Sequence, residues 1–224
     1  MGSVSVLACE MMGHEVRAAM AEAGLDCPVH WVERELHNYP ARLREELQTR
    51  LDALDSDTVL LAFAQCGNAV AGLEARRSTL VLPRFADCVH LLRSVSPGDP
   101  GQVDMDTLYT FPGFLELRSG LFKEYDRCCL RYGPEKAQRI CRMMVRHYRA
   151  VSLMDTGAVD PAPFAPTAEE LAQLLGLACE SCSGNYRVLT KLFSGEWDEE
   201  FVVVPRGSHL DEDVFFHHPQ AQLL

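Results

Sequence analysis

The chain lacks a surplus of positive charge. Its 224 residues include 21 Lys and Arg against 32 Asp and Glu, for a formal net charge of −11. We therefore expect no general attraction to nucleic acid or to an anionic membrane surface. The chain also lacks an apolar run of bilayer length, and residues 1–16 lack the basic segment and apolar core of an export signal. These absences predict a cytoplasmic protein that binds neither nucleic acid nor a membrane.

A glycine-rich phosphate loop is missing as well. The turn after the first expected strand is Ala8-Cys9-Glu10-Met11, which places an acid where a phosphate would lie. This turn excludes the common dinucleotide fingerprint.

What the chain does contain is a continuous apolar run that begins at Thr58 and stops at Gln65-Cys66-Gly67-Asn68. Such a run, bounded by turn formers and without alternation, predicts a strand buried on both faces of a parallel sheet. Cys66 then lies at the carboxyl end of the strand, where open α/β sheets bind ligands, and Gly67 with Asn68 would turn the backbone into a helix.

The flanking segments predict an α/β domain with a Rossmann-like parallel sheet flanked by helices. Further strands are expected at residues 3–9, 27–32 and 79–83, and helices at 10–24 and 40–54. Connections of about twenty residues favour right-handed crossovers between parallel strands.

A helical insertion is expected within this single domain, over residues 95–149, where it would act as a lid. Its helices should span 121–132 and 134–148, and the basic side of the second would be a solvated face or bind phosphate or an acidic partner.

The sheet is expected to resume at 150–154. A helix capped by Thr167 with Glu170, a helix at 185–193 and a last buried strand at 201–205 should follow.

Four residues that can bind a metal follow the expected strands: Cys9, His37, Cys66 and Cys88. Because the carboxyl ends of parallel strands meet at one edge, these side chains should lie close together. Thiolate and neutral imidazole suit a tetrahedral zinc site, with iron as the alternative metal. The other reduced thiols are expected to be core or incidental residues, namely Cys128, Cys129, Cys141, Cys179 and Cys182.

Two carboxylates, Asp87 and Asp155, are the candidate acid/base groups at the same edge, although turn caps and salt bridges explain such residues equally well. The preferred function is a metal-dependent enzyme that transfers a group to or from sulfur on a small molecule. One alternative is a metal-free cysteine racemase or lyase that uses Cys66. The segment Cys66-Gly67-Asn68 resembles the Cys-Asn-Thr turn of aspartate/glutamate racemases, but this chain lacks the second cysteine turn that those enzymes have. The other is a non-catalytic module that binds a metal, a small molecule or a partner protein.

Motifs along nearly the whole chain resemble one family. They are Ala8-Cys9, Leu36-His37-Asn38-Tyr39-Pro40, Gln65-Cys66-Gly67-Asn68, Leu82-Pro83-Arg84, Asp87-Cys88, Phe111-Pro112-Gly113, Asp155-Thr156-Gly157, Gly195-Glu196-Trp197-Asp198 and Val203-Val204-Pro205. Together they are similar to the family called domain of unknown function 1638. The chain departs from its pattern at Arg206, where a second proline is expected.

The family pattern includes Cys9, His37, Cys66 and Cys88, so the resemblance supports the metal-site hypothesis. It also implies an association with corrinoid-dependent methyl-transfer systems, and hence a corrinoid protein as a partner. The resemblance implies no particular reaction.

Overall fold

A computed structural model describes residues 2–116, 118 and 120–215. The chain divides into two compact units: the first comprises Met1–Gln102 and Asn185–Leu224, and the second comprises Val103–Gly184. Each unit has its own parallel-dominated sheet, as an α/β fold predicts. No helix among the described residues is long and apolar enough to cross a bilayer.

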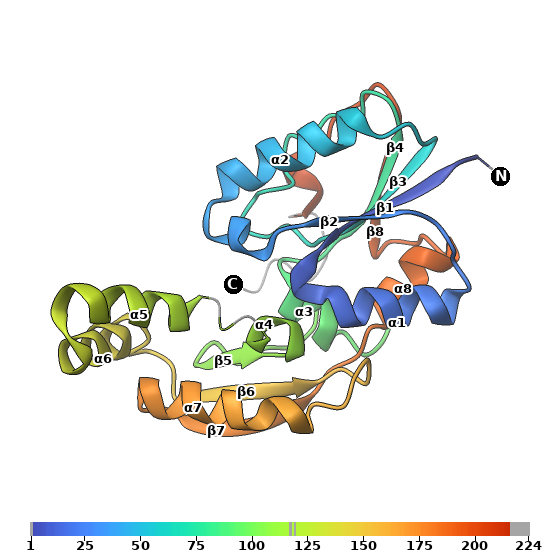
Figure 1. Cartoon of the computed structure of the whole chain (residues 1–224). Helices are drawn as coiled ribbons and strands as arrows, with labels where there is room; N and C mark the ends of the chain where they lie inside the picture. The colour runs from blue at the N-terminus through green and yellow to red at the C-terminus, as the bar shows by residue number, and fades with distance from the viewer. Residues whose placement is uncertain (1, 117, 119, 216–224) are drawn as a thin grey trace. The chain divides into compact units, whose positions relative to one another are not determined.

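The first unit is built on a five-stranded sheet of order β2-β1-β3-β4-β8 (Figure 1). Its strands are β1 (Val4–Cys9), β2 (Val29–Val32), β3 (Thr58–Ala62), β4 (Thr79–Pro83) and β8 (Phe201–Val204). The first four are parallel, which confirms the Rossmann-like prediction, and β8 closes one edge by pairing antiparallel to β4.

Helices cover both faces of this sheet (Figure 1). Helix α2 (Pro40–Ala53) lies on one face and turns Leu43, Leu47 and Leu51, one helical turn apart, into the core. The other face carries α1 (Gly13–Ala23), which follows the short 3₁₀ turn η1 (Glu10–Met12), and α8 (Arg187–Ser194). Helix α3 (Cys88–Arg93) follows β4.

No helix connects β3 to β4, although the sequence predicted one. Residues 63–78 form turns instead, and Val70 and Leu73 are buried in the core below α2. The C-terminal segment holds this connection in place: the Gly72 amide donates to the Leu210 carbonyl (2.8 Å), and the Leu210 amide donates to the Leu73 carbonyl (2.8 Å). Contacts distant in sequence therefore replace the local helix.

The second unit carries a three-stranded parallel sheet of order β5-β6-β7. The strands are β5 (Thr107–Thr110), β6 (Ala150–Asp155) and β7 (Ala178–Ser183); the helices are α4 (Pro112–Leu115), α5 (Leu121–Tyr132), α6 (Pro134–Met144) and α7 (Ala165–Leu175), with η3 (Ala162–Phe164) before α7.

Three expectations for this region are wrong. Residues 150–154 belong to the second sheet and do not resume the first. Residues 178–183, expected to be helical or loop-like, form a strand along β6. Thr167 lies inside α7, which begins at Ala165 without a side-chain cap. The expected helices at 121–132 and 134–148 are present as α5 and α6, but residues 95–149 also contain strand β5.

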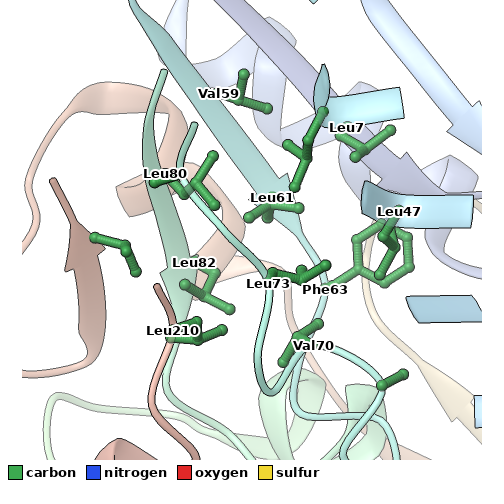
Figure 2. Packing of buried hydrophobic residues seen from close by; sticks show 14 of the residues in the cluster. Leu7, Leu47, Val59, Leu61, Phe63, Val70, Leu73, Leu80, Leu82 and Leu210 are labelled. Carbon is green, nitrogen blue, oxygen red and sulfur yellow. The ribbon is translucent and has the colours of Figure 1, made fainter. Parts of the chain in front are cut away.

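Leucine and valine side chains fill the space between the first sheet and α2 (Figure 2). Leu61, on the central strand β3, is 0% exposed. Its neighbours in the cluster come from β1, β4 and α2, so the core joins all the main elements on this face.

We expect Leu61→Ala to lower the free energy of unfolding by about 2–5 kcal/mol, because it removes buried methyl groups and leaves a cavity. Val203→Ala is the matched control: Val203 lies on β8 but is 47% exposed, and the loss there should stay within about 0.5 kcal/mol. Urea denaturation measures both. Equal losses would show that this cluster is not the stabilising core.

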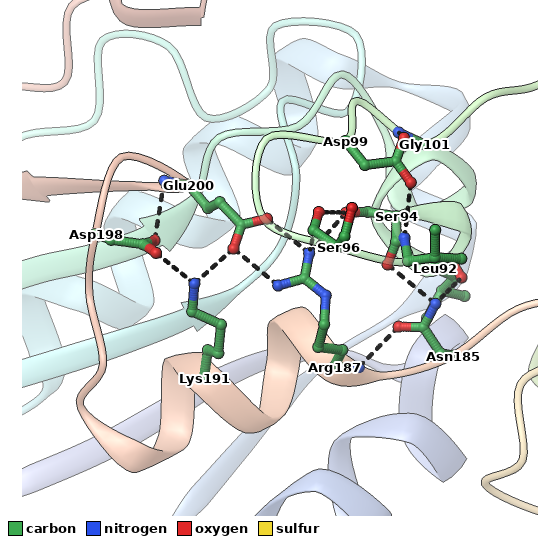
Figure 3. A network of polar contacts seen from close by, with 11 residues as sticks. Leu92, Ser94, Ser96, Asp99, Gly101, Asn185, Arg187, Lys191, Asp198 and Glu200 are labelled. Atoms are coloured by element: carbon green, nitrogen blue, oxygen red, sulfur yellow. Dashed lines mark hydrogen bonds and ion pairs between the residues drawn. The ribbon is translucent and has the colours of Figure 1, made fainter.

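A buried ion-pair network fixes α8 and the start of β8 (Figure 3). The Glu200 carboxylate, 1% exposed, accepts from the Arg187 guanidinium (2.6 and 2.8 Å) and from Lys191 Nζ (2.6 Å). Burial alone would raise the pKa of Glu200, but the hydrogen bonds and charges of Arg187 and Lys191 outweigh it and hold that pKa below its ordinary value. The carboxylate is therefore ionised in the folded protein at neutral pH.

We expect Glu200→Gln to cost about 3–5 kcal/mol of unfolding free energy at pH 7, because it leaves the partly buried Arg187 guanidinium without its carboxylate and leaves Lys191 with Asp198 alone. The folded pKa of Glu200 lies below its ordinary value of 4.5. The difference from wild type should therefore be complete above that value and shrink as pH falls through the folded pKa. Denaturation curves between pH 7 and pH 3 test this. Glu196→Gln, at an exposed position of the same loop, serves as control, and a pH-independent difference would contradict the assignment.

Candidate functional site

The strand order places a topological switch point between β1 and β3. The chain leaves β1 toward β2 on one side, returns to β3 on the other side and continues outward to β4. In open α/β sheets, ligands bind beyond the carboxyl ends of the two strands that flank such a point. Cys9 is the last residue of β1, and Cys66 follows β3 by four residues.

Cys9 is held beside His37. The thiol, 2% exposed, accepts from the Met11 amide (3.3 Å) at the start of η1. Its Sγ lies 3.7 Å from Nδ1 and 3.8 Å from Nε2 of His37, which is on the 3₁₀ turn η2 (Arg34–Asn38) after β2. The ring stacks on Phe63, and burial lowers the pKa of His37, so the imidazole is neutral at pH 7.

Cys66 occupies a strained turn. Its φ is +48°, and Gly67 (+63°) and Asn68 (+66°) continue in the left-handed region, which costs a residue with a Cβ atom about 1–2 kcal/mol. Backbone bonds from Gln65 to Phe85 (2.9 Å) and from Cys66 to Ala86 (3.1 Å) tie the turn to the loop after β4. Strain that surrounding structure maintains is typical of functional positions.

The strain predicts that Cys66→Gly will be more stable than Cys66→Ala by about 1 kcal/mol, because glycine adopts positive φ without steric cost. Both variants remove the thiol, so the pair isolates the backbone effect. Chemical denaturation of metal-free protein measures it. Equal stabilities would mean that the turn is not strained.

Cys88 is the first residue of α3, and Asp87 caps that helix. The Asp87 carboxylate accepts from the His90 amide (2.9 Å) and lies 2.8 Å from His90 Nδ1. Burial would raise the pKa of Asp87, but these bonds lower it below its usual range, and the same contact raises the pKa of His90. Asp87 is therefore an ionised cap that orients the first turn of α3.

The three thiols influence one another electrostatically. Burial raises the pKa of Cys9 and of Cys66 to about 12, and that of Cys88 well above its usual value. A charge on Cys9 opposes ionisation of Cys66, one on Cys66 opposes Cys88, and one on Cys88 opposes Cys9. These thiols are therefore protonated at neutral pH, and each lies within electrostatic reach of another.

Sequence reasoning missed two charged residues of this region. Glu15, on α1, is 0% exposed, and its charge raises the pKa of Cys88. Arg34, 8% exposed, lies at the start of η2, and its charge lowers the pKa of Cys9. Helical spacing places Glu15 beside Val16 and Ala19 on the inner, apolar face of α1. A charged residue on an apolar helix face is unusual, and this feature of the sequence could have identified Glu15.

Three further candidates belong to the second unit. Asp155 ends β6 in the second sheet, so the expectation that it shares an edge with Cys66 is wrong. Cys179 and Cys182 have a C-x-x-C spacing, but both are on strand β7, where residues three apart point to opposite faces. Within residues 2–215, excluding 117 and 119, no three His, Cys, Asp or Glu side chains are already arranged to hold a metal ion.

A family model described as "Protein of unknown function (DUF1638)" matches residues 31–193, more than half of the chain. The chain belongs to this family. The match confirms the resemblance inferred from the motifs, and it spans His37, Cys66, Asp87 and Cys88 while Cys9 precedes it. The description carries no function, so the corrinoid association stays a prediction. Comparisons with curated proteins and with solved structures found no match.

Proposed function

We propose that the carboxyl edge of the first sheet binds one zinc ion through three of the four residues Cys9, His37, Cys66 and Cys88. The fourth coordination position would then be open to the small molecule on which the protein acts. The observation that carries the proposal is that three thiols and one imidazole each follow a parallel strand at the carboxyl edge of the sheet, around its topological switch point, and that Cys9 contacts His37 there. Such a donor set is characteristic of zinc.

The Cys9–His37 pair supports the proposal geometrically. Zinc–sulfur and zinc–nitrogen bonds at a tetrahedral angle place the two ligand atoms roughly 3.6 Å apart, and Cys9 Sγ lies 3.7 Å from His37 Nδ1 and 3.8 Å from His37 Nε2. Because the sulfur is almost equally near both ring nitrogens, the ring must also turn to direct one lone pair at a shared ion. Cys66 and Cys88 follow loops that are hydrogen-bonded to each other, so rotation about their side-chain torsions would complete the set. The proposal requires that movement, because the described side chains do not yet form a three-ligand group.

The chain's own groups have distinct parts in this site. The Met11 amide orients the Cys9 sulfur, stacking on Phe63 orients the His37 ring, and Asp87 fixes the helix start that carries Cys88. Bound zinc would supply Lewis acidity, which suits holding a substrate thiol as thiolate or polarising a carbonyl. Group transfer to or from sulfur is the reaction class that we propose, with Asp87 as the acid/base group nearest the metal ligands in sequence.

The second candidate is a metal-free thiol enzyme of the racemase or lyase class, which the absence of a ready three-ligand group among the described residues favours. It requires a thiolate, and burial opposes ionisation of Cys66. For this reason we rank it second. A non-catalytic binding module would use the same residues without turnover.

We expect anaerobically purified protein to bind about one equivalent of zinc. Cys66→Ser should weaken binding by at least about tenfold, because it removes a thiolate ligand. Competition with a chromophoric chelator measures the affinity. Cys27→Ser is the matched control, since Cys27 lies in the same unit before β2 and thus away from the carboxyl edge.

Folded wild-type protein that binds no zinc would refute the proposal. In that case selective alkylation of Cys66 distinguishes the remaining candidates: a reactive thiol supports the metal-free enzyme, and an inert one supports a binding module.

A further inference from the structure

Arg84 is a partly buried cation to which the described residues offer no counter-ion. Its Nε is shielded from solvent and has no hydrogen-bond partner, and among the described residues no carboxylate forms an ion pair with it. Its one side-chain hydrogen bond runs from a terminal nitrogen to the Phe201 carbonyl, at 3.3 Å. A neutral carbonyl at that distance compensates little of the cost of removing a guanidinium from water.

Arg187, another partly buried arginine of the same unit, does have a carboxylate partner. Its Nε is also shielded and without a partner. Its terminal nitrogens, however, form a bidentate pair with Glu200, and one of them also donates to Ser94 Oγ (2.7 Å). Partly buried arginine is thus matched by a carboxylate near the start of β8, whereas Arg84, near the same strand, is not.

The position of Arg84 links it to the candidate site. It directly follows β4, and Phe201, which its guanidinium contacts, is the first residue of the antiparallel strand β8. The guanidinium therefore lies at the carboxyl edge of β4. The loop that Arg84 begins receives the backbone bonds from Gln65 and Cys66, so it is tied directly to the Cys66 turn.

We propose that Arg84 anchors an oxyanion, the carboxylate or phosphate group of a small-molecule ligand, at the carboxyl edge of the first sheet. A planar guanidinium with free donors matches either group through paired hydrogen bonds. Arg34, buried at the same edge, adds a second positive charge. The assignment rests on the proposed function only in that the same edge receives the substrate; the anion subsite itself needs no metal.

The test compares wild type with Arg84→Gln in chelator-treated protein, with inorganic phosphate or acetate added at constant ionic strength. In buffer free of both anions we expect Arg84→Gln to be at least as stable as wild type, because it removes a partly buried charge that no carboxylate of the described residues compensates. We expect phosphate or acetate to raise the urea midpoint of wild type saturably, and the apparent affinity to fall about ten- to hundredfold in Arg84→Gln. The anion that stabilises wild type identifies the anionic group of the ligand as a phosphate or a carboxylate.

Arg77→Gln is the matched control, since Arg77 is 51% exposed and pairs with Asp55; it should keep the anion response. Arg84→Lys keeps the positive charge but loses the paired donors of the guanidinium, and it replaces Arg84→Gln if that variant does not fold. Its stabilisation by the anion should be weaker than that of wild type. A wild type that responds to neither anion, or an Arg84→Gln protein that responds like wild type, would overturn the proposal. Zinc affinity measured on Arg84→Gln separates the two proposals, because loss of the anion subsite should leave it unchanged.

Discussion

The structure of the first unit depends on the burial of β3 on both faces. This strand is the middle of the five, with β1 on one side and β4 on the other, and its residues from Val59 onward are essentially inaccessible to water. Side chains on one face of β3 meet α2, so the strand can neither slip by one residue nor be exposed without emptying the core. Its carboxyl end is fixed accordingly, and Cys66 is delivered to the centre of the sheet edge.

Holding three thiols at that edge has an energetic cost that the rest of the site must offset. Cys66 adopts a left-handed backbone, and burial opposes ionisation of every thiol in the group. Hydrogen bonds from Gln65 and Cys66 to the loop after β4 stabilise the turn, and the Asn68 carbonyl accepts from Arg44 on α2 (2.6 Å). A turn with no task beyond reversing the chain would be cheaper with glycine at position 66. The strain and its support therefore argue for a function of this thiol.

The sequence was informative where local pattern and global fold agree. The apolar run of β3, the Pro-initiated α2 with leucines one turn apart, and the ligand types after β1, β2, β3 and β4 were all readable from it. It misled where distant contacts decide. A helix is expected after Asn68, but the Leu73 carbonyl accepts from the amide of Leu210, more than a hundred residues later, and no helix forms there. Strand β7 has no β-branched residue, and it forms because its backbone pairs with β6. The same pairing makes β6 part of a second sheet, which the sequence pattern around Asp155 does not indicate.

The sheet edge holds charges of both signs. The protein carries a formal net charge of −11 and Asp87 is ionised at this edge, but Arg34 and Arg84 also lie there while the thiols are neutral. Ionised thiolates would repel one another in this enclosed space unless a cation joined them, and a guanidinium lacking a carboxylate favours an anion from outside the chain. The two proposed sites are thus electrostatically complementary. A metal at the switch point would take the place of the thiol protons, and an oxyanion would neutralise the Arg84 guanidinium. Together the two proposals favour one small molecule that carries both a metal-binding atom and an anionic group as the ligand of this edge.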